Sequence, residues 1–461
     1  MRMPRTAVVL AILATFGARA FAGEGEARIH APEDDLPSAT VGGYRIDFAR
    51  NGACVVSRDG RNLFDMGLVY AMPGWKEWGT QRRRSGREDG WELDPADPAS
   101  LLSHGTLFGF DGTERFRFTQ KTSVMSGGVR LAYSITPLAE RKLGEFGLVL
   151  HFPVLQTKGA DAEFWPGFGE LILPESRKSA RLYRGNARAA HVFLADSFGV
   201  QAVAGKPLLW TLLDDRAWQL NTYRFIGSDR QLTTALSKGE KADFTFDLLL
   251  GDRACKDLPL GKGRLTIDPY GRIAIHASGK KLAEGGLKLK ARRPGRWLYE
   301  TAQPAAAMPD GMISGTAGGP GTDWGYDVQG TVENGLALLA LRAHKAGGEA
   351  RQDDTQFALA VPSSEVEAPP TTAAPGAETA PDAPGSSRKP GQHRITVAFK
   401  DGLVLELEAE VPWEVRKTDV FRQECFLLSV PIGEVGEGED KAAVRIGVRL
   451  TSDTEPTGAR T

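Results

Sequence analysis

The chain has little cysteine, no excess of charge of either sign, and no long apolar run beyond its first residues. Its 461 residues include only 3 cysteines, so a disulfide framework does not hold this fold together. The 57 Lys and Arg against 58 Asp and Glu give a formal charge of -1, which argues against a nucleic-acid partner. No later segment approaches the roughly 20 apolar residues of a membrane span. We therefore expect a mature chain that does not insert into a membrane.

Local motifs for metals and nucleotides are missing as well. The 7 histidines stand singly, and no HExxH, HxH or CxxC spacing occurs. There is also no P-loop, no Rossmann fingerprint and no nucleophile elbow. The sequence therefore indicates no cofactor and no locally assembled metal site, although Asp94 and Asp97 leave a structural calcium ion open. Cys54, Cys255 and Cys425 allow at most one disulfide, and neither their pairing nor the oligomeric state follows from the sequence.

The first residues of the chain have the features of a targeting signal. Arg2 and Arg5 precede the apolar run of residues 7–16, and small residues follow at Ala20 and Ala22. This arrangement is typical of a secretory signal peptide, and the apolar run is about half the length of a membrane anchor. We predict a signal peptide over residues 1–22 with cleavage near Ala22, a lead segment over 23–43, and a secreted or periplasmic protein.

The body of the chain has the periodicity of strands. Apolar and polar residues alternate in Tyr44–Phe48 and Phe244–Phe246, and turns such as Asp59-Gly60 separate such runs. Helical periodicity is almost absent. These features predict an all-β fold of antiparallel sandwiches with few helices. Within it, His151 stands in the apolar run LVLHFPV, where we expect a buried imidazole.

Two parts of the chain also resemble each other in sequence. Identical residues recur 219 positions apart at Gly52, Gly60, Leu63, Gly67 and Leu68, which match Gly271, Gly279, Leu282, Gly286 and Leu287. Further matches join Gly128 to Gly335 and Pro153 to Pro362. We predict an internal duplication into two related β-sandwich units in tandem, residues 44–258 and 259–461. A Pro/Ala/Thr-rich segment, 363–392, is expected as a solvated insertion in the second unit, a linker before a small C-terminal β-unit being the alternative.

Residues found in only one copy are freer to carry a function. The loop MPGWKEWGTQRRRSGREDGW combines tryptophans with arginines, and an indole can stack on a pyranose ring while a guanidinium binds carboxylate or sulfate. The candidate carbohydrate-binding residues are Trp75, Trp78, Trp91, Arg82, Arg83, Arg84 and Arg87. The alternative is that the tryptophans seal the end of the sandwich while the arginines face water.

A second feature of the first copy is an aromatic turn between Glu163 and Glu170. Two carboxylates can act as acid and base on a glycosidic bond if they lie about 5–9.5 Å apart and burial raises the pKa of one. Glu163 and Glu170 are therefore weak candidates for catalysis. A structural role in the turn is the competing interpretation.

The segment Gly60–Gly67 and the loop Pro73-Gly74-Trp75 resemble the β-sandwich domains of secreted bacterial carbohydrate-active proteins, of the galactose-mutarotase-like or glycosidase-flanking type. The resemblance implies a carbohydrate ligand, and the His and Glu pair of mutarotases has no convincing counterpart in this chain. Our leading hypothesis is a non-catalytic polysaccharide-binding protein, with anionic glycans as ligands. The alternatives are a polysaccharide lyase or glycoside hydrolase, and an envelope structural or interaction protein without a sugar ligand.

Overall fold

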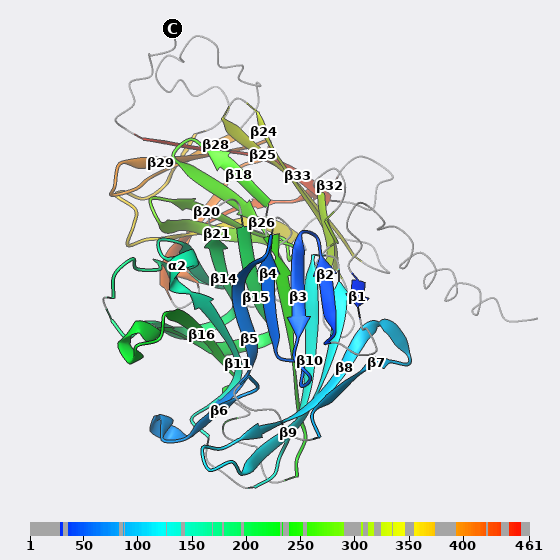
Figure 1. Ribbon diagram of the computed structural model, residues 1–461. Coiled ribbons are helices and arrows are strands. Elements are labelled where there is room, and N and C mark those ends of the chain that lie inside the picture. Colours follow the sequence, from blue (N-terminus) through cyan, green and yellow to red (C-terminus); the bar gives the residue numbers. More distant parts are fainter. Residues whose placement is uncertain are drawn as a thin grey trace, which may run out of the picture. The chain divides into compact units, whose positions relative to one another are not determined.

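A computed structural model of the protein describes most of the chain between residues 28 and 452 (Figure 1). The described ranges are 28–30, 36–82, 86, 88–125, 127–139, 143–167, 169–177, 179–194, 198–230, 233, 239–251, 256–289, 306–307, 312–317, 324–333, 335–345, 355–373, 393–420, 423–434 and 442–452. The predicted signal peptide lies outside them, so secretion stays a prediction. No helix among these residues is long and apolar enough to cross a membrane.

The fold is all-β, as the sequence predicts, and its strands pair antiparallel. The chain forms two compact units, which we call unit 1 (residues 1–158, 174–186 and 201–250) and unit 2 (159–173, 187–200 and 251–461). Residues 159–173 and 187–200, which the sequence division assigns to the first copy, thus group with unit 2. Helical structure in the described part is short, as in α2 (Val154–Thr157) and the 3-10 turns η1 (Pro73–Trp75) and η2 (Asp215–Trp218).

Unit 1 is built from two runs of strands. One pairs in the order β1-β2-β3-β4-β5-β11-β16-β15, with β6 added to β5, and the other in the order β7-β8-β9-β10-β17. The long strand β15 pairs with both β16 and β17 and so joins the two runs. The strands are β1 (Arg28–His30), β2 (Ser38–Val41), β3 (Tyr44–Phe48), β4 (Cys54–Arg58), β5 (Arg61–Ala71), β6 (Trp78–Thr80), β7 (Gly90–Asp94), β8 (Asp97–Phe108), β9 (Glu114–Met125), β10 (Gly128–Pro137), β11 (Glu145–Pro153), β14 (Arg181–Leu194), β15 (Phe198–Asp214), β16 (Thr222–Ser228) and β17 (Ala242–Leu250); β14 ends and β15 begins in unit 2.

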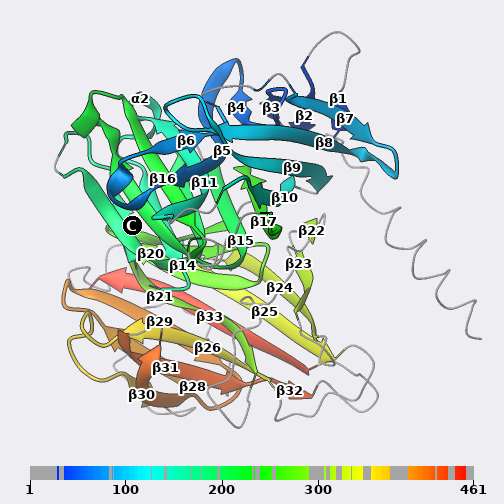
Figure 2. The ribbon, with the colours of Figure 1, turned by 90° about the horizontal axis from the view of Figure 1, so that it is seen from below.

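Unit 2 contains two further sheets (Figure 2). The first has the order β18-β19-β20-β21-β26-β31-β30, and the second β22-β23-β24-β25-β33-β29-β28-β27, with β32 beside β33. The strands are β12 (Asp161–Trp165), β13 (Gly169–Ile172), β18 (Lys256–Leu260), β19 (Gly263–Ile267), β20 (Arg272–Ala277), β21 (Lys280–Leu289), β22 (Ala306–Ala307), β23 (Met312–Ala317), β24 (Trp324–Glu333), β25 (Leu336–Lys345), β26 (Thr355–Pro362), β27 (Thr371–Ala373), β28 (His393–Ala398), β29 (Leu403–Ala409), β30 (Glu414–Val420), β31 (Gln423–Pro431), β32 (Gly433–Glu434) and β33 (Ala442–Ser452).

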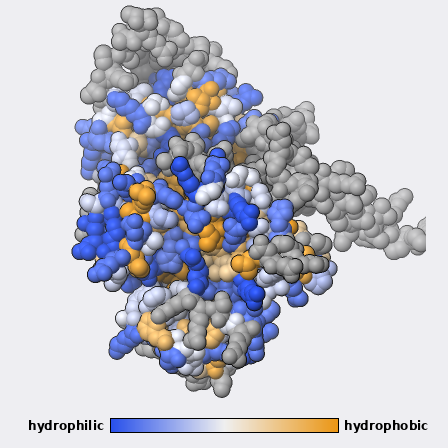
Figure 3. Space-filling model, in the orientation of Figure 1, coloured by the Kyte–Doolittle hydropathy of each residue, from blue (hydrophilic) through white to orange (hydrophobic). Residues whose placement is uncertain are grey.

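The alternation of buried and more exposed residues along the strands shows which faces form the core. In β29 every second residue, from Leu403 to Ala409, is buried, and in β3 the side chains of Tyr44, Ile46 and Phe48 are buried while Arg45 is exposed. Because successive side chains of a strand point to opposite faces, each such strand contributes one apolar face to a core. Hydrophobic residues on the face seen in Figure 3 occur in small groups among hydrophilic ones.

The two units correspond in backbone detail where the sequence aligns them. The order β3-β4-β5-β11-β16 in unit 1 has its counterpart in β19-β20-β21-β26-β31 of unit 2, and β9-β10-β17 in β24-β25-β33. A register shift falls between Val56 and Ser57 in β4, and another falls 219 residues later between Ile275 and His276. Gly60 and Gly279, also 219 residues apart, adopt φ of 73° and 70°, which favours glycine. A duplication predicts these correspondences, and the duplication itself stays a prediction.

The Pro-rich segment is partly structured. Residues 363–373 are described, Val366 is buried and bridges Phe399, and β27 pairs with β28 at the edge of its sheet. Pro369 and Pro370 precede β27, a place where a missing N–H breaks no ladder bond. Residues 363–373 are therefore structured, and all of them except Val366 are exposed or half-buried, while residues 374–392 lie outside the described part.

Candidate functional site

Four aromatic side chains of unit 1 form a row that we call the aromatic strip: Phe110, Trp78, Trp75 and Trp218. The rings of Phe110 and Trp78 lie 5.8 Å apart edge to face, and those of Trp78 and Trp75 lie 6.4 Å apart. The guanidinium of Arg224 lies 5.7 Å from the Trp75 ring and 5.9 Å from the Trp218 ring, and so connects them. Phe110 is 51% exposed and Trp218 is 53% exposed, while Trp75 and Trp78 are half-buried. The strip is therefore a partly exposed aromatic surface.

The turn η1 positions Trp75. Gly74 and Trp75 both have positive φ, at 70° and 58°, and the Trp75 N–H donates to the Met72 carbonyl. Such a backbone turns the indole back onto the sheet, where it packs against Val69 and Ile226 and their buried neighbours. One part of the ring is thus fixed by core contacts, and the rest is open.

Arg115 ties together the two loops that carry Trp78 and Phe110. Its guanidinium binds Glu77, which precedes Trp78, at 2.8 and 3.2 Å, and Asp111, which follows Phe110, at 2.9 and 3.0 Å. Arg115 is only 6% exposed, while the side chain of Glu77 is 22% exposed and that of Asp111 is 57% exposed. The relative placement of the two rings is consequently held by a half-buried ion pair to Glu77 and by a more exposed one to Asp111.

A buried amide network closes the same loop at its other end. Gln81 accepts the Leu68 N–H at 2.8 Å and donates to the Asn51 carbonyl and to the Gln120 side chain. Gln120 in turn donates to the Gly52 carbonyl at 3.0 Å. Because buried amides are costly to leave without partners, this network specifies where the loop rejoins the sheet.

Arg224 is locked in place between the indoles. Its Nε and Nη2 donate to the two oxygens of the buried Asp215 at 2.9 and 2.7 Å, and Thr222 donates to the same carboxylate at 3.0 Å. A bidentate pair of this kind fixes the plane of the guanidinium as well as its charge. The Nη1 donors of Arg224 are not used in these bonds.

A histidine–aspartate pair lies next to Arg224. His151 Nδ1 is 2.8 Å from Asp65 Oδ1, and Arg82 pairs with Asp65 Oδ2. Burial acts to raise the pKa of Asp65, but the hydrogen bonds of His151 and Arg82 outweigh it and lower the pKa. The expectation of a buried imidazole is wrong, because the side chain of His151 is 22% exposed on a polar part of the sheet face.

The predicted carbohydrate-binding residues separate into three groups. Trp75, Trp78 and Arg82 lie in the region just described. Trp91 is half-buried on β7, opposite Ser103 and apart from β6 (Figures 1 and 2). Arg83, Arg84 and Arg87 lie outside the described residues.

Glu163 lies in unit 2 and is completely buried. Its carboxylate pairs with Arg272 at 2.6 Å and Lys281 at 3.1 Å, both also buried. Burial alone would raise the pKa of Glu163, but the charges of Arg272 and Lys281 outweigh it and hold the pKa well below its usual range. Catalysis as an acid requires the opposite direction and access to substrate, so these facts favour a structural role. Glu170 pairs with Glu163 across the β12–β13 ladder, and its side chain lies outside the described part.

The surroundings of Glu163 form a larger buried charge cluster in unit 2. It comprises Glu163, His191, Asp268, Arg272, His276, Lys281 and Glu284, each at most 4% exposed. Arg272 also binds Asp268 at 2.9 Å, and Lys281 binds Glu284 at 2.7 Å. Both ring nitrogens of His191 lack a hydrogen-bond partner, although Nδ1 lies 3.5 Å from Glu163. Burial lowers the pKa of His191, which favours the neutral ring.

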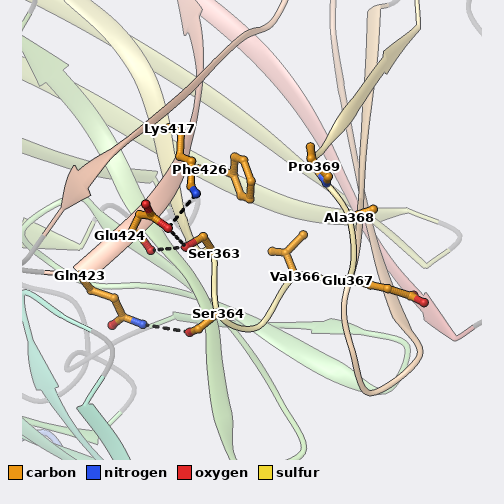
Figure 4. A pocket seen from close by; sticks show the side chains of 10 residues that line it. All are labelled: Ser363, Ser364, Val366, Glu367, Ala368, Pro369, Lys417, Gln423, Glu424 and Phe426. Atoms are coloured by element: carbon orange, nitrogen blue, oxygen red, sulfur yellow. Dashed lines mark hydrogen bonds and ion pairs between the residues drawn. The ribbon is translucent and has the colours of Figure 1, made fainter.

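A shallow hollow of about 550 Å³ lies in unit 2 beside the structured part of the Pro-rich segment (Figure 4). Phe426 and Val366 line its apolar part. Its polar groups are satisfied by each other, since Ser363 donates to Glu424 at 2.8 Å and Lys417 pairs with Glu424 at 2.9 Å. These groups give the hollow no chemistry beyond that of an ordinary polar surface.

The described residues contain no cluster of His, Cys, Asp or Glu suited to a metal ion. Asp94 binds Lys121 at 2.6 Å and Asp97 binds Ser100 at 2.6 Å, so both carboxylates are engaged within the protein. Cys54 and Cys425 are buried free thiols, and burial raises the pKa of Cys425 to about 12. Neither is a reactive thiolate near neutral pH.

Trp218, Phe110 and Arg224 are site residues that the sequence interpretation missed. A signal for Trp218 existed, because in the alignment that places Asp215 on Asp419, the residue opposite Trp218 is Arg422. On the predicted duplication, Trp218 is thus particular to the first copy. Phe110 had no such signal, since it lies in an ordinary turn before Asp111-Gly112.

No family model matches the chain, and no curated protein matches it. Among solved structures, an Escherichia coli K12 protein described as a "Putative aldose 1-epimerase" overlaps 49% of this chain and 99% of its own, with 11% identity and a TM-score of 0.30. The structure of HI1317 overlaps the same shares with 7% identity and a TM-score of 0.28. Likeness at this level does not establish a shared family or activity.

Proposed function

We propose that the protein binds polysaccharide through the aromatic strip of unit 1. The observation that carries the proposal is the row from Phe110 through Trp78 to Trp75, which the Arg224 guanidinium extends to Trp218; its two end members, Phe110 and Trp218, are half exposed. An aromatic ring offers a flat apolar face, and the C–H face of a pyranose is its natural partner. Several such rings in a row suit successive sugars of a chain better than a single small molecule.

The cations beside the strip favour an anionic glycan. Arg224 keeps Nη1 donors beyond its bonds to Asp215, and the side chain of Arg82 is 41% exposed. Guanidinium groups bind carboxylate or sulfate bidentately. Stacking would then supply the affinity for the ring, and the arginines would select uronates or sulfated sugars.

The alternatives find less support. A hydrolase with Glu163 as its acid would need a reachable carboxyl group with a raised pKa, whereas Glu163 is fully buried with a lowered one. An envelope protein without a sugar ligand predicts that the loop tryptophans are buried, whereas Trp75 and Trp78 are half-buried and Trp218 is 53% exposed.

The test is affinity electrophoresis and a glycan array with single variants. Trp218→Ala and Trp78→Ala are each expected to weaken binding at least about tenfold, or about 1.4 kcal/mol. Trp91→Ala is the matched control, because Trp91 lies on a different strand pair from the strip. Rising salt should weaken the arginine contribution and leave the stacking contribution unchanged. Equal binding by all three variants would show that the aromatic strip is not the binding site.

A further inference from the structure

We propose that unit 1 also carries an acid–base centre, His151 with Asp65, which cleaves uronate polysaccharides by β-elimination. The inference rests on the proposed glycan binding, and it replaces the hypothesis that the protein binds polysaccharide without catalysing a reaction. The reaction needs a base, a cation to hold the substrate carboxylate, and a surface to position the sugar. The described residues bring these three together on one face of one sheet.

The base is His151. Its Nδ1 faces Asp65 Oδ1 at 2.8 Å, and Asp65 is the partner of His151 across the β11–β5 ladder. A carboxylate on Nδ1 favours the tautomer whose proton lies on Nδ1, so the lone pair is on Nε2. Arg82 holds the second oxygen of Asp65 and stops the carboxylate from rotating away. Asp65 is therefore a positioning residue, and His151 is the proposed catalytic residue.

The cation lies on the opposite side of the imidazole. Arg224 is the ladder partner of His151 across β11 and β16, so the three side chains Asp65, His151 and Arg224 form one row across the sheet. Directly opposed residues have Cβ atoms about 4.5–5.5 Å apart. A carboxylate bound to the unused donors of Arg224 would thus lie within reach of His151 Nε2.

The positioning surface is the aromatic strip. Trp75 packs against a buried cluster that includes Val149, which is two residues from His151 and therefore on the same face of β11. Arg224 contacts the Trp75 ring and is the neighbour of His151 in the ladder. A sugar stacked on Trp75 is consequently next to the proposed base.

The proposed step balances without a further reactant. His151 Nε2 removes the proton from the carbon that bears the uronate carboxylate, and Arg224 stabilises the negative charge that develops on the carboxylate. The electron pair of the broken C–H bond forms a double bond to the neighbouring ring carbon. The bond from that carbon to the glycosidic oxygen breaks, and the leaving oxygen takes the proton back from His151. The products are a new reducing end and a chain that ends in an unsaturated uronate.

The arrangement fits elimination better than hydrolysis. Hydrolysis canonically uses two carboxyl groups about 5–9.5 Å apart. Glu145, on the same face of β11, is six residues from His151, or about 20 Å along an extended strand. Asp215 is engaged with Arg224, and Asp65 with His151 and Arg82. Elimination requires only one base and a charge-neutralising group.

The experiment follows release of unsaturated uronate by ultraviolet absorbance with polygalacturonate, alginate and chondroitin sulfate, and with a neutral β-glucan as the control polymer. The full mature chain is compared with His151→Gln, Asp65→Asn and His104→Gln. His104 is an exposed histidine of unit 1 on β8, outside the row, and serves as the matched control. Retention of each variant on the same polymers is measured in parallel, so that a misfolded variant is recognised by lost binding.

We expect product from at least one uronate polymer and none from the β-glucan. His151→Gln should lower kcat/KM by at least about 10²-fold while retaining binding. Asp65→Asn should lower kcat more than it changes KM, and His104→Gln should leave the rate unchanged.

Three outcomes overturn the proposal. Binding to uronate polymers with no product from the wild type would refute the acid–base centre and leave the glycan-binding function standing. Product release that His151→Gln and His104→Gln retain equally would assign the chemistry to other residues. Neither binding nor product on any polymer would refute the centre and the glycan-binding function together.

Discussion

Replacement of Glu163 by glutamine tests whether the buried charge cluster holds unit 2 together. The substitution keeps the size of the side chain and removes the charge that pairs with Arg272 at 2.6 Å and with Lys281 at 3.1 Å. Removing one partner of a buried ion pair costs about 3–5 kcal/mol, because the remaining charge stays out of water without compensation. Here each cation keeps another carboxylate: Arg272 keeps Asp268 and the more distant Glu284, and Lys281 keeps Glu284. We therefore expect a loss near the lower end, about 3 kcal/mol.

The same reasoning about uncompensated charge predicts a larger loss of stability for a second variant. Arg272→Met leaves Glu163, Asp268 and Glu284 buried with Lys281 as the one lysine or arginine in the cluster. That state has a larger uncompensated charge than Glu163→Gln, so the loss should approach about 5 kcal/mol. Glu424→Gln is the matched control, because it removes a carboxylate of unit 2 that pairs with Lys417 in an exposed ion pair. Exposed pairs contribute little, and this variant should unfold like the wild type.

The assay is chemical denaturation at pH 7, followed by far-ultraviolet circular dichroism and tryptophan fluorescence, and repeated towards acid pH. The pKa of Glu163 is lowered from its usual 4.5 in the folded protein, so the stabilisation by its charge is complete above 4.5. It disappears as the pH falls through the folded-state pKa, and wild type and Glu163→Gln should converge there. A Glu163→Gln midpoint equal to that of Glu424→Gln would refute the reasoning, as would a stability difference that persists unchanged into strong acid.

Two further predictions concern buried polar groups. Burial lowers the pKa of His191, so the ring stays neutral in the folded protein, whereas the unfolded chain takes up a proton below the usual pKa of 6.5. Stability is therefore lost as the pH falls below 6.5. His191→Phe should reduce that loss, which denaturation midpoints measured between about pH 7 and 5 would show. Gln81→Ala leaves the Leu68 N–H and the Gln120 side chain without their partner and should cost about 1–3 kcal/mol of stability. Because Gln81 closes the loop that carries Trp75 and Trp78, the same variant should weaken glycan binding in the array without removing a ring; unchanged binding would show that the loop is held elsewhere.

The sequence predicts those features that local patterns determine. Alternation in Tyr44–Phe48 and turns such as Asp59-Gly60 are properties of neighbouring residues, and the strands β3 to β5 follow from them. Trp75 and Trp78 could be proposed because they share one loop. The aromatic strip as a whole could not be proposed from the sequence. Arg115 and Arg224 bring Phe110 and Trp218 to that loop through contacts between residues that are distant in the sequence.

Charge pairing over long sequence separations explains the remaining failures. The apolar neighbours of His151 in the run LVLHFPV predict a buried side chain, yet a strand has two faces, and the partner of His151 on its own face is Asp65, 86 residues earlier. Proximity in the sequence suggests Glu170 as the partner of Glu163. Its partner in the fold is Arg272, 109 residues later. Such pairings are invisible until strand order is known.

The correspondence between the units gives a way to separate scaffold from function. Where the backbone agrees 219 residues apart, as at the Val56–Ser57 and Ile275–His276 register shifts, both positions serve the same local geometry and neither is informative about a ligand. Where the residues differ at matched positions, as with Trp218 and Arg422, the scaffold does not require the side chain. Trp218 is 53% exposed and still stacks on Arg224, so unit 1 has an aromatic surface that packing alone does not demand. Binding of a ligand to that surface is the simplest physical reason to keep it, and the Trp218→Ala variant tests that reason directly.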